Sequence, residues 1–405
     1  MHLLYNLGIY FYGLLIKLLS PFNPKAKQWI NGRKDFYKNL PPISNDNVYW
    51  FHCASLGEFD QALPVINLIK STNPSIFVLV TFFSPSGYLH FHKRNHKADY
   101  VCYLPLDTQN NSEKFIKHFN PVKAFFVKYE FWANYIFELK KTKAELYSIS
   151  AIFRPDQRFF KKNNSFFKSI LYKFDHFFIQ NEISAELLKS IGITNFDITG
   201  DTRFDRVIEN KNNLTKNEIL DQFSNGQKTV ILGSTWTIDE KLIIPLINKE
   251  SWTQKVIIAP HDISENHINE IIKLLQTPFI RYSNLEKGMK YSNEKVLILD
   301  TIGHLANAYS YGEVAYVGGG FTGSLHNILE PAVFGLPVIF GPKHSRFPEG
   351  EMFINEGIGF SITTEIEFQE KYTLIIKNIK DLKAKTEKLI QLQTGASEKI
   401  VSFLN

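Results

Sequence analysis

Short apolar runs alternate with amphipathic stretches along the first half of the chain. Apolar runs of about four to eight residues are typical of buried strands, and apolar residues spaced three to four apart indicate helices. This pattern predicts a parallel sheet covered by helices on both faces. The predicted strands are residues 48–54, 76–83, 100–104, 124–127, 146–153 and 176–180, and the predicted helices are 61–71, 112–119, 133–141 and 184–191.

A polar stretch interrupts this alternation. Residues 201–227 are rich in Asn and Lys and lack a strand pattern, so we place a domain boundary there. The fold class expected is α/β, with Rossmann-like, doubly wound domains over residues 21–205 and 206–405 and a cleft between them. The second set of predicted strands is 229–232, 255–259, 279–282, 296–299, 314–317, 337–340 and 360–363, followed by a long helical pattern over 365–405 that is a candidate to pack back on the first domain.

Residues 1–20 are almost wholly apolar, with Asn6 and Lys17 as the polar breaks. About 20 apolar residues can just cross a bilayer. Lys17 and the absence of a small-residue cleavage site argue against a signal peptide. A basic segment follows, which places the next domain on the cytoplasmic side. We expect a membrane anchor that spans the bilayer or lies in its interface; a buried core helix is the alternative.

Composition narrows the function classes. A length of 405 residues favours two domains. The net charge of +6 is not gathered in one basic block, which disfavours a nucleic-acid-binding arm and fits an anionic substrate or membrane surface. Cys53 and Cys102 are the only cysteines, and neither has a metal-ligand spacing, so a disulfide framework and a zinc site are not expected.

The first candidate for chemistry is Glu58, which follows the first predicted strand in the sequence Ser55-Leu56-Gly57-Glu58. A glycine here allows a tight turn into a helix that we expect to begin near Phe59. Glu58 at the start of that helix is explained either by a favourable interaction with the helix dipole or by a role as general base. Ser55 and Gly57 beside it are candidate substrate contacts.

The second candidate is the glycine-rich segment 318–323. Its glycines have the spacing of a dinucleotide fingerprint, but basic residues stand at 343–346, where an NAD site has an acid. The backbone N–H groups of Gly319 and Gly320, with a helix beginning near Leu325, predict an anion site for a nucleotide phosphate. Glu330 in that helix is either solvated or, as we favour, an acceptor for ribose hydroxyls.

Three further segments follow predicted strands. Ser234 and Thr235 either cap the next helix or cradle phosphate. His261 is either a solvated loop histidine or a contact for phosphate or base. Glu130, at the end of a strand in the first half, either pairs with a basic side chain or positions an acceptor.

Together and in this order, these segments resemble the bacterial 3-deoxy-D-manno-octulosonic acid (Kdo) transferases of lipid A biosynthesis, which have the GT-B fold. Residues 50–58 (WFHCASLGE) resemble the family's W-x-H-A-x-S-x-G-E signature, and residues 130–134 (EFWAN) resemble E-L-W-P-N. Residues 103–107 resemble Y-x-P-x-D, and residues 326–342 (HNILEPAVFGLPVIFGP) are the most specific match.

The resemblance implies roles for individual residues. Glu58 falls on the catalytic base and Glu130 on a second essential acid. His261 stands where many members have arginine, so the basic partner of the phosphate is left open among Arg281, Lys343 and Arg346. The residues that fall on the CMP-binding side are Ser234, Thr235, Gly303, Asn327 and Glu330.

The implied reaction is transfer of Kdo from CMP-Kdo to the 6′-hydroxyl of a lipid A precursor, with inversion at the anomeric carbon. We expect no metal or other cofactor, because no Asp-x-Asp motif stands at a strand end. The implied partners are CMP-Kdo, the lipid A precursor and the cytoplasmic face of the inner membrane, without nucleic acid. Alternatives are another GT-B transferase or an epimerase using a UDP-sugar, or a non-catalytic lipid-binding scaffold.

Overall fold

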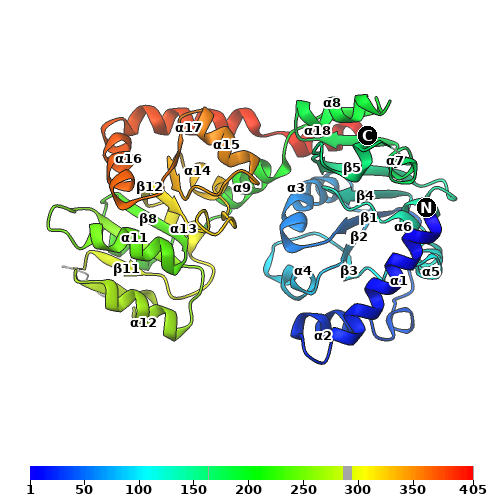
Figure 1. The fold of residues 1–405 in the computed structure, drawn as a ribbon, viewed down its shortest axis with the longest axis horizontal. Coiled ribbons are helices and arrows are strands. Elements are labelled where there is room, and N and C mark those ends of the chain that lie inside the picture. The colour runs from blue at the N-terminus through cyan, green and yellow to red at the C-terminus, as the bar shows by residue number, and fades with distance from the viewer. Residues whose placement is uncertain (163, 286–293, 405) are drawn as a thin grey trace. The chain divides into compact units, whose positions relative to one another are not determined.

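The computed structural model describes residues 1–162, 164–285 and 294–404. The chain forms two compact units, the first made of Met1–Arg206 with Gln393–Asn405 and the second of Val207–Leu392. Each unit has its own parallel sheet and its own hydrophobic core (Figure 1).

The sheet of the first unit has seven described strands in the order β3-β2-β1-β4-β5-β6-β7. The chain builds outward from β1 to β3 and then returns to the other side of β1 with β4, so the direction of winding reverses between β1 and β4. Ligands of doubly wound sheets bind at this switch point, beyond the carboxyl ends of the strands. The strands are β1 (Val48–Cys53), β2 (Phe77–Phe82), β3 (Tyr100–Tyr103), β4 (Lys123–Val127), β5 (Glu145–Ala151), β6 (His176–Ile179) and β7 (Phe196–Ile198).

Alternate side chains of β1 pack into two hydrophobic cores, because successive side chains of a strand point to opposite faces of the sheet. Val48 and Trp50 belong to one core, whereas Phe51 and Cys53 belong to the other. Both faces of the sheet are therefore covered by helices. On one face lie α3 (Leu56–Thr72), α4 (Pro85–His90) and α18 (Ala396–Leu404); on the other lie α5 (Gln109–Phe119), α6 (Ala133–Leu139), α7 (Ser165–Leu171) and α8 (Glu182–Ser190).

The sheet of the second unit has the order β10-β11-β9-β8-β12-β13-β14 in the described residues, and its winding reverses between β8 and β12. Val230 and Leu232 of β8 lie in one core, and Ile231 lies in the other. The strands are β8 (Thr229–Thr235), β9 (Lys255–Pro260), β10 (Phe279–Arg281), β11 (Val296–Ile298), β12 (Gly312–Val317), β13 (Val338–Phe340) and β14 (Gly359–Ser361).

The helices of this unit again cover both faces. Those that contribute to the core of Val230 are α11 (Thr237–Ile247), α12 (Glu265–Leu274) and α16 (Glu365–Lys377), and those on the core of Ile231 are α10 (Glu218–Ser224) and α13 (Leu305–Tyr309). The remaining helices are α9 (Thr202–Asn212), α14 (Leu329–Ala332), α15 (Pro348–Asn355) and α17 (Ile379–Gln393), and the short 3-10 turns of the chain are η1 (Phe36–Lys38), η2 (Phe91–Lys93), η3 (Arg158–Phe160) and η4 (Tyr282–Asn284).

Two elements differ from the sequence-based expectation. Strand β7 is only three residues long and its pattern is mostly polar, so no apolar run marked it. The helical pattern over 365–405 forms three helices rather than one. Asn378 ends α16, and Gly395, at φ 95°, adopts a left-handed conformation between α17 and α18.

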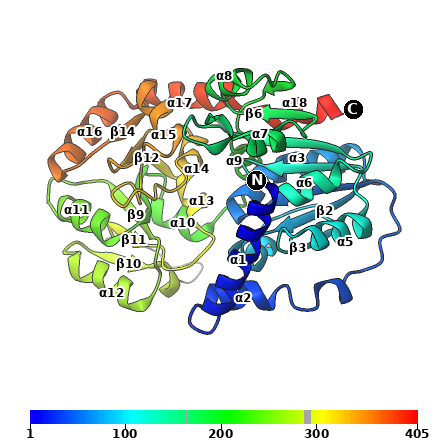
Figure 2. The same ribbon diagram turned by 45° about the vertical axis from the view of Figure 1, so that its right-hand side comes forward.

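The apolar N-terminus forms α1 (His2–Leu19), which is followed by α2 (Pro24–Asn31). The polar residues of α1 face the first unit: Tyr5 Oη donates to Asp107 Oδ2 at 2.6 Å, and Asn134 Nδ2 donates to Asn6 Oδ1 at 2.9 Å. In Figures 1 and 2, α1 runs from α6 to α2 along this unit.

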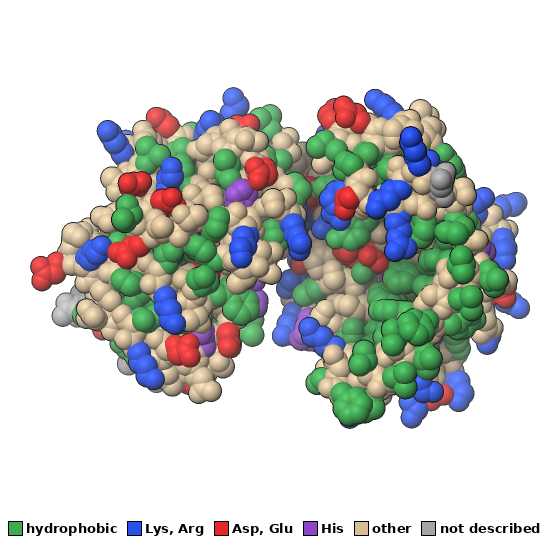
Figure 3. Space-filling view, in the orientation of Figure 1, with side chains coloured by type: hydrophobic (Ala, Val, Ile, Leu, Met, Phe, Trp, Pro, Cys, Tyr) green, Lys and Arg blue, Asp and Glu red, His purple; other side chains and the backbone are tan. Residues whose placement is uncertain are grey.

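The opposite side of α1 is apolar and exposed. Figure 3 shows hydrophobic side chains gathered on this part of the first unit. The helix is long and apolar enough to cross a membrane by length and composition, with a mean hydropathy of 1.3. The exposed apolar side chains are Leu3, Leu4, Leu7, Tyr10, Phe11, Leu14, Leu15, Leu18, Leu19 and, beyond the helix, Phe22.

Candidate active site

Glu58 lies at the carboxyl end of β1, the switch point of the first sheet. Helix α3 begins at Leu56, three residues earlier than predicted, so Glu58 occupies the third helical position. It forms a capping box with Ser55, in which Glu58 Oε2 accepts from the backbone N–H of Ala54 and, at 3.2 Å, from that of Ser55. Glu58 therefore does stabilise the start of a helix, as one of the two explanations predicted. Ser55 is the other residue of the capping box that orients the Glu58 carboxylate.

The environment of Glu58 alters its acidity. Its side chain is buried, and burial together with the neighbouring charge of Glu130 raises the pKa of Glu58 to about 8, against the opposing effect of the Ala54 N–H and of Lys128. A carboxylate whose pKa lies near neutral pH is a much stronger base than an ordinary surface glutamate.

Glu130 follows β4, the strand hydrogen-bonded to β1. Parallel neighbours end at the same edge of the sheet, and this brings the segments after Cys53 and Val127 together. Glu130 Oε2 accepts from Trp132 Nε1 at 2.9 Å and lies 3.7 Å from His52 Nε2. The structure therefore joins the two predicted acids in one site.

The backbone around this edge is strained. Lys128 and Ser150, at the ends of β4 and β5, have φ of 63° and 49°, in the left-handed region. Non-glycine residues held there cost about 1–3 kcal/mol each and cluster at functional sites. Ser150 is held by Thr202, whose Oγ1 lies 2.7 Å from Ser150 Oγ.

The sequence-based explanation of Gly57 is wrong. Its φ is not positive, so no tight turn requires glycine there. A Cβ at position 57 would instead meet nothing within 4 Å. Gly57 is exposed at the second position of α3, so it leaves open space directly beside Glu58.

In the second unit, the glycine-rich segment follows β12 at the switch point. Its glycines are required by close backbone approaches: a Cβ on Gly318 would lie 2.2 Å from Ser234 O, and one on Gly320 would lie 2.5 Å from Gly341 N. Gly319 has φ 87°, which also favours glycine. The loops after β8, β12 and β13 thus pack tightly together.

The helix predicted near Leu325 is not formed there. Residues 324–327 are not helical, and α14 comprises only Leu329–Ala332. The expected helix-dipole contribution to an anion site is therefore wrong, because a helix of four residues sums few peptide dipoles. Backbone N–H groups of the loop are the donors that this segment offers. Asn327 Nδ2 donates to Glu330 Oε1 at 3.3 Å, which orients that carboxylate.

Thr235 and Ser234 have different environments. Thr235 is buried, and its hydroxyl donates to Glu240 Oε1 at 2.8 Å, so it is engaged inside the unit. Ser234 is half-buried and has φ 53°, a third strained residue at a switch point. The oxygens of Asp239 accept from Tyr316 Oη at 2.5 Å and from Gly319 N at 3.4 Å, which ties α11 to the glycine loop.

His261 is part of an aromatic stack. Its ring lies 4.4 Å from the Trp236 ring and 4.6 Å from that of His326. Trp236 Nε1 donates to His326 Nε2 at 3.2 Å, and burial, aided by His261, lowers the pKa of His326 to about 4. This aromatic stack was not predicted, because nothing in the sequence spacing links residues 236 and 326.

The structure places the basic residues that the sequence offered as partners of the phosphate. Arg281 is engaged by two carboxylates, Asp300 Oδ2 at 2.7 Å and Glu265 Oε1 at 2.5 Å. Lys343 is exposed, its backbone N–H donates to Gly320 O at 2.7 Å, and its Cβ borders Gly323. Lys343 is therefore a basic residue beside the glycine loop, and Arg346, three residues further along the chain, is exposed.

Gly303 lies in a separate part of the second unit. It has φ 98° and borders a pocket of about 370 Å³ with Asn217, Tyr282 and His304. The rings of Tyr282 and His304 lie 4.4 Å apart, so an aromatic surface forms one wall.

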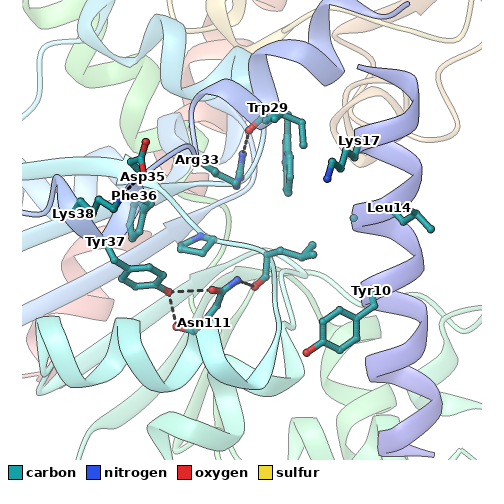
Figure 4. Close-up of a pocket in the computed structure, with 14 residues that line it drawn as sticks. Tyr10, Leu14, Lys17, Trp29, Arg33, Asp35, Phe36, Tyr37, Lys38 and Asn111 are labelled. Carbon is teal, nitrogen blue, oxygen red and sulfur yellow. Dashed lines mark hydrogen bonds and ion pairs between the residues drawn. The ribbon is translucent and has the colours of Figure 1, made fainter. Parts of the chain in front are cut away.

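A larger pocket of about 650 Å³ lies against α1 (Figure 4). Tyr10 and Lys17 of α1 extend toward the side of Arg33 and Trp29, whereas Leu14, which also lines the pocket, points away from them in this view. Arg33 donates to three carbonyl oxygens, lies 3.9 Å above the Trp29 ring, and has no carboxylate partner among the described residues. Burial lowers the pKa of Arg33 to about 9. The pocket thus combines an apolar wall with an unneutralised cation.

Several known proteins that are similar to this chain are Kdo transferases. The family described as 3-deoxy-D-manno-octulosonic-acid transferase (kdotransferase) matches residues 29–206, which contain Glu58 and Glu130. The 3-deoxy-D-manno-octulosonic acid transferase of Aquifex aeolicus is 27% identical over 363 residues, covering 88% of this chain and 93% of that protein. These similarities support Kdo transfer in lipopolysaccharide biosynthesis and hence glycosyltransferase activity.

Two further comparisons define the extent of the similarity. A bifunctional glycosyltransferase/methyltransferase of Fusobacterium nucleatum is 24% identical over 93% of this chain, which spans 59% of that protein's length. A UDP-GlcNAc 2-epimerase from Neisseria meningitidis, bound to UDP-GlcNAc, superimposes with a TM-score of 0.62 at 17% identity, over 88% of this chain and 98% of that one. The second similarity concerns the fold alone, and it confirms the predicted class of two doubly wound α/β domains.

Proposed function

We propose that this chain transfers Kdo from CMP-Kdo to the 6′-hydroxyl of a lipid A precursor, with Glu58 as the general base. The observation that carries the proposal is the buried Glu58 carboxyl at the β1–β4 switch point, beside Glu130 and next to the open space at Gly57. The similarity to Kdo transferases supports a CMP-Kdo donor and a lipid A precursor as acceptor.

In the proposed step, Glu58 Oε takes the proton of the acceptor hydroxyl while that oxygen bonds to the anomeric carbon of Kdo. The bond from that carbon to the phosphate oxygen breaks, and CMP leaves with the electron pair. Attack opposite the leaving group inverts the anomeric centre. General-base catalysis of this kind contributes about 10²–10⁴-fold to the rate.

Glu130 has a supporting role in this proposal. A fixed negative charge beside Glu58 disfavours its ionised form and so strengthens it as a base. The Trp132 N–H holds the Glu130 carboxylate in place.

On the donor side, the nucleotide is assigned to the second unit. Gly319 and Gly320 offer backbone donors to the phosphate, Ser234 adds a hydroxyl, and Lys343 adds the positive charge. The stack of His261 and Trp236 offers a flat surface to a pyrimidine base or sugar, and Asn327 with Glu330 offers acceptors to ribose hydroxyls. Thr235 contributes through its backbone, since its hydroxyl is engaged by Glu240. Gly303 borders the separate pocket of Tyr282 and His304, so we assign it no phosphate contact.

No metal or other cofactor enters the proposed mechanism. CMP already leaves as an anion, so the leaving group needs donors and positive charge rather than a protonating acid. Chelation with EDTA should therefore leave the rate unchanged.

We further propose that α1 lies in the membrane interface on the cytoplasmic face of the inner membrane rather than crossing the bilayer. Its polar residues Tyr5 and Asn6 are hydrogen-bonded to the first unit, and its opposite face is apolar along the whole helix. An amphipathic helix of this kind buries one face in the headgroup region. The adjoining pocket, with Arg33 and Lys17, then suits the acyl chains and phosphate of the acceptor.

The test is a transfer assay with CMP-Kdo and a lipid A precursor, with the product weighed by mass spectrometry. Glu58→Gln should bind CMP-Kdo with unchanged affinity in calorimetry but lose at least about 100-fold in kcat. Glu113→Gln, on the exposed surface of α5, is the matched control and should behave like wild type. Normal turnover by Glu58→Gln would refute the base assignment, and tighter binding of UDP-sugars than of CMP-Kdo would favour a different transferase or an epimerase.

A further inference from the structure

His52 is a buried histidine of β1 to which the mechanism above gives no role. It is fully shielded from solvent among the rings of Trp50, Phe126 and Trp132. Its Nδ1 lies 2.9 Å from Oγ1 of Thr81 on the neighbouring strand β2. Its Nε2 has no hydrogen-bond partner among the described residues and lies 3.7 Å from Glu130 Oε2.

The hydrogen bonds around Thr81 define which nitrogen of His52 carries the proton. The indole N–H of Trp50 can only donate, and it lies 2.8 Å from Thr81 Oγ1, so this oxygen accepts. Thr81 is itself fully buried, and His52 Nδ1 is the acceptor that the described residues offer to its hydroxyl hydrogen. A neutral imidazole that accepts at Nδ1 carries its proton on Nε2, the nitrogen that faces Glu130.

We propose that His52 is a positioning residue for Glu130, held by Trp50 and Thr81 as a neutral N–H donor directed at that carboxylate. The inference rests on the proposed function, because it takes Glu58 as the general base and Glu130 as the charge beside it. Glu130 Oε2 lies 3.7 Å from Nε2, which is longer than a hydrogen bond but close enough for attraction between an N–H dipole and a carboxylate.

The protonation state of His52 determines the charge that Glu58 experiences. A neutral donor attracts the Glu130 carboxylate without cancelling its charge, whereas an imidazolium would neutralise it. Other titratable groups also lie near the two carboxylates. Lys128 favours the ionised form of Glu58. Both carboxylates raise the pKa of the Tyr129 hydroxyl and of the Cys53 thiol. Arg154 lies 5.8 Å from the Tyr129 ring, so it is one residue further removed. The neutral histidine therefore preserves the Glu130 charge that raises the basicity of Glu58.

The direct test is the tautomer of His52 in the full-length wild-type chain, read from ¹⁵N chemical shifts of histidine-labelled protein. The His52 signals are assigned by their loss in His52→Gln. We expect the neutral ring to carry its proton on Nε2 and to leave Nδ1 unprotonated. A neutral ring with its proton on Nδ1 would overturn the proposal without any activity measurement.

Two substitutions at Thr81 test the consequence for catalysis. Thr81→Val keeps the shape but removes the hydroxyl that donates to Nδ1, and Thr81→Ser keeps the hydroxyl. Thr81→Val should lose roughly tenfold in kcat with KM for CMP-Kdo unchanged, and its pH–rate profile should move toward lower pH because Glu130 is no longer held beside Glu58. Thr81→Ser should restore both the tautomer and the profile. A Thr81→Val enzyme with a wild-type tautomer and profile would contradict the inference.

Different results would refute the proposed Kdo transfer and the proposed role of His52. If the wild-type chain transfers no Kdo, the proposed function falls while the tautomer measurement still reports on His52. If Kdo transfer is normal and Nδ1 is protonated, the positioning role falls and the assignment of Glu58 stands.

Discussion

Trp132 donates its indole N–H to Oε2 of Glu130, with 2.9 Å between nitrogen and oxygen. The two residues lie in the loop after β4, and this bond fixes a carboxylate that also lies 3.7 Å from His52 Nε2. Trp132 also stacks on Phe83 at 4.5 Å, so its ring is held independently of the acid.

Replacing Trp132 with Phe should therefore weaken catalysis more than folding. The ring contact with Phe83 is largely kept, but Glu130 loses its donor, and we expect roughly a tenfold drop in kcat with little change in melting temperature. Trp252→Phe, which removes a comparable indole bond to Gln254 O at 3.1 Å in the second unit, is the control and should leave kcat unchanged.

The pH dependence of transfer should report Glu58. Because the base must be ionised and its pKa is about 8, kcat/KM should rise with pH and level off above that value. Glu130→Gln removes the neighbouring charge and should move this limb to lower pH. A wild-type profile that is flat between about pH 6 and pH 9 would contradict the assignment.

Glu58 should also make stability pH-dependent. Its pKa is raised from 4.5 to about 8 on folding, so the folded state binds the proton more tightly, and the stability gained below pH 4.5 is lost as pH rises through about 8. Glu58→Gln cannot ionise and should be more stable than wild type at about pH 9, by of the order of 2 kcal/mol. Urea unfolding at about pH 5 and pH 9 measures the difference, which should be small at the lower pH.

Gly57→Ala tests whether a substrate occupies the open space at Gly57 when it binds. A methyl group there meets no protein atom within 4 Å, and alanine favours helix, so the melting temperature should be unchanged or slightly higher. If the acceptor or donor occupies this space, kcat/KM should fall by at least about tenfold. Gly8→Ala on α1, where the added Cβ also meets nothing within 4 Å, is the matched control.

The apolar face of α1 should be required for membrane binding. Replacing Leu3, Leu7, Leu14 and Leu18 with Ser removes exposed apolar surface without touching the Tyr5 contact, and each buried leucine contributes about 1.5–3 kcal/mol to partitioning. We expect binding to anionic vesicles to be lost in flotation assays while the chain stays folded. Vesicle binding that survives these changes would argue for attachment elsewhere.

Much of this architecture followed from the sequence. The alternating apolar runs identified six strands of the first unit and all seven of the second, because strands buried on both faces are continuous apolar runs. Helix boundaries and α14 were less accurate. Ser324 N and His326 N donate to the carbonyl oxygens of Gly319 and Gly318, so the glycine-rich loop determines the backbone here rather than local helix preference.

The site was only partly predictable. Glu58 and Glu130 were identified from their positions after strands, and parallel pairing of β1 and β4 explains why they meet. The roles of Trp132, Thr81 and Trp236 depend on side-chain hydrogen bonds and ring contacts between distant segments, which no spacing rule encodes. Likewise, the absence of any contact at Gly57 is a property of the surroundings, not of the glycine.

Helix α18 has a consequence for how the protein is made. Asp205 Oδ1 accepts from Gly395 N at 2.6 Å, Asp205 Oδ2 accepts from Ser397 N at 2.7 Å, and Ile400 and Val401 join the same core as Phe59 of α3. The packing around the helix that presents Glu58 is thus completed by a segment that follows the whole second unit in the chain. The first unit therefore reaches its final packing only after the second unit and α18 have been synthesised, and the Glu58 carboxylate waits as long for its finished surroundings.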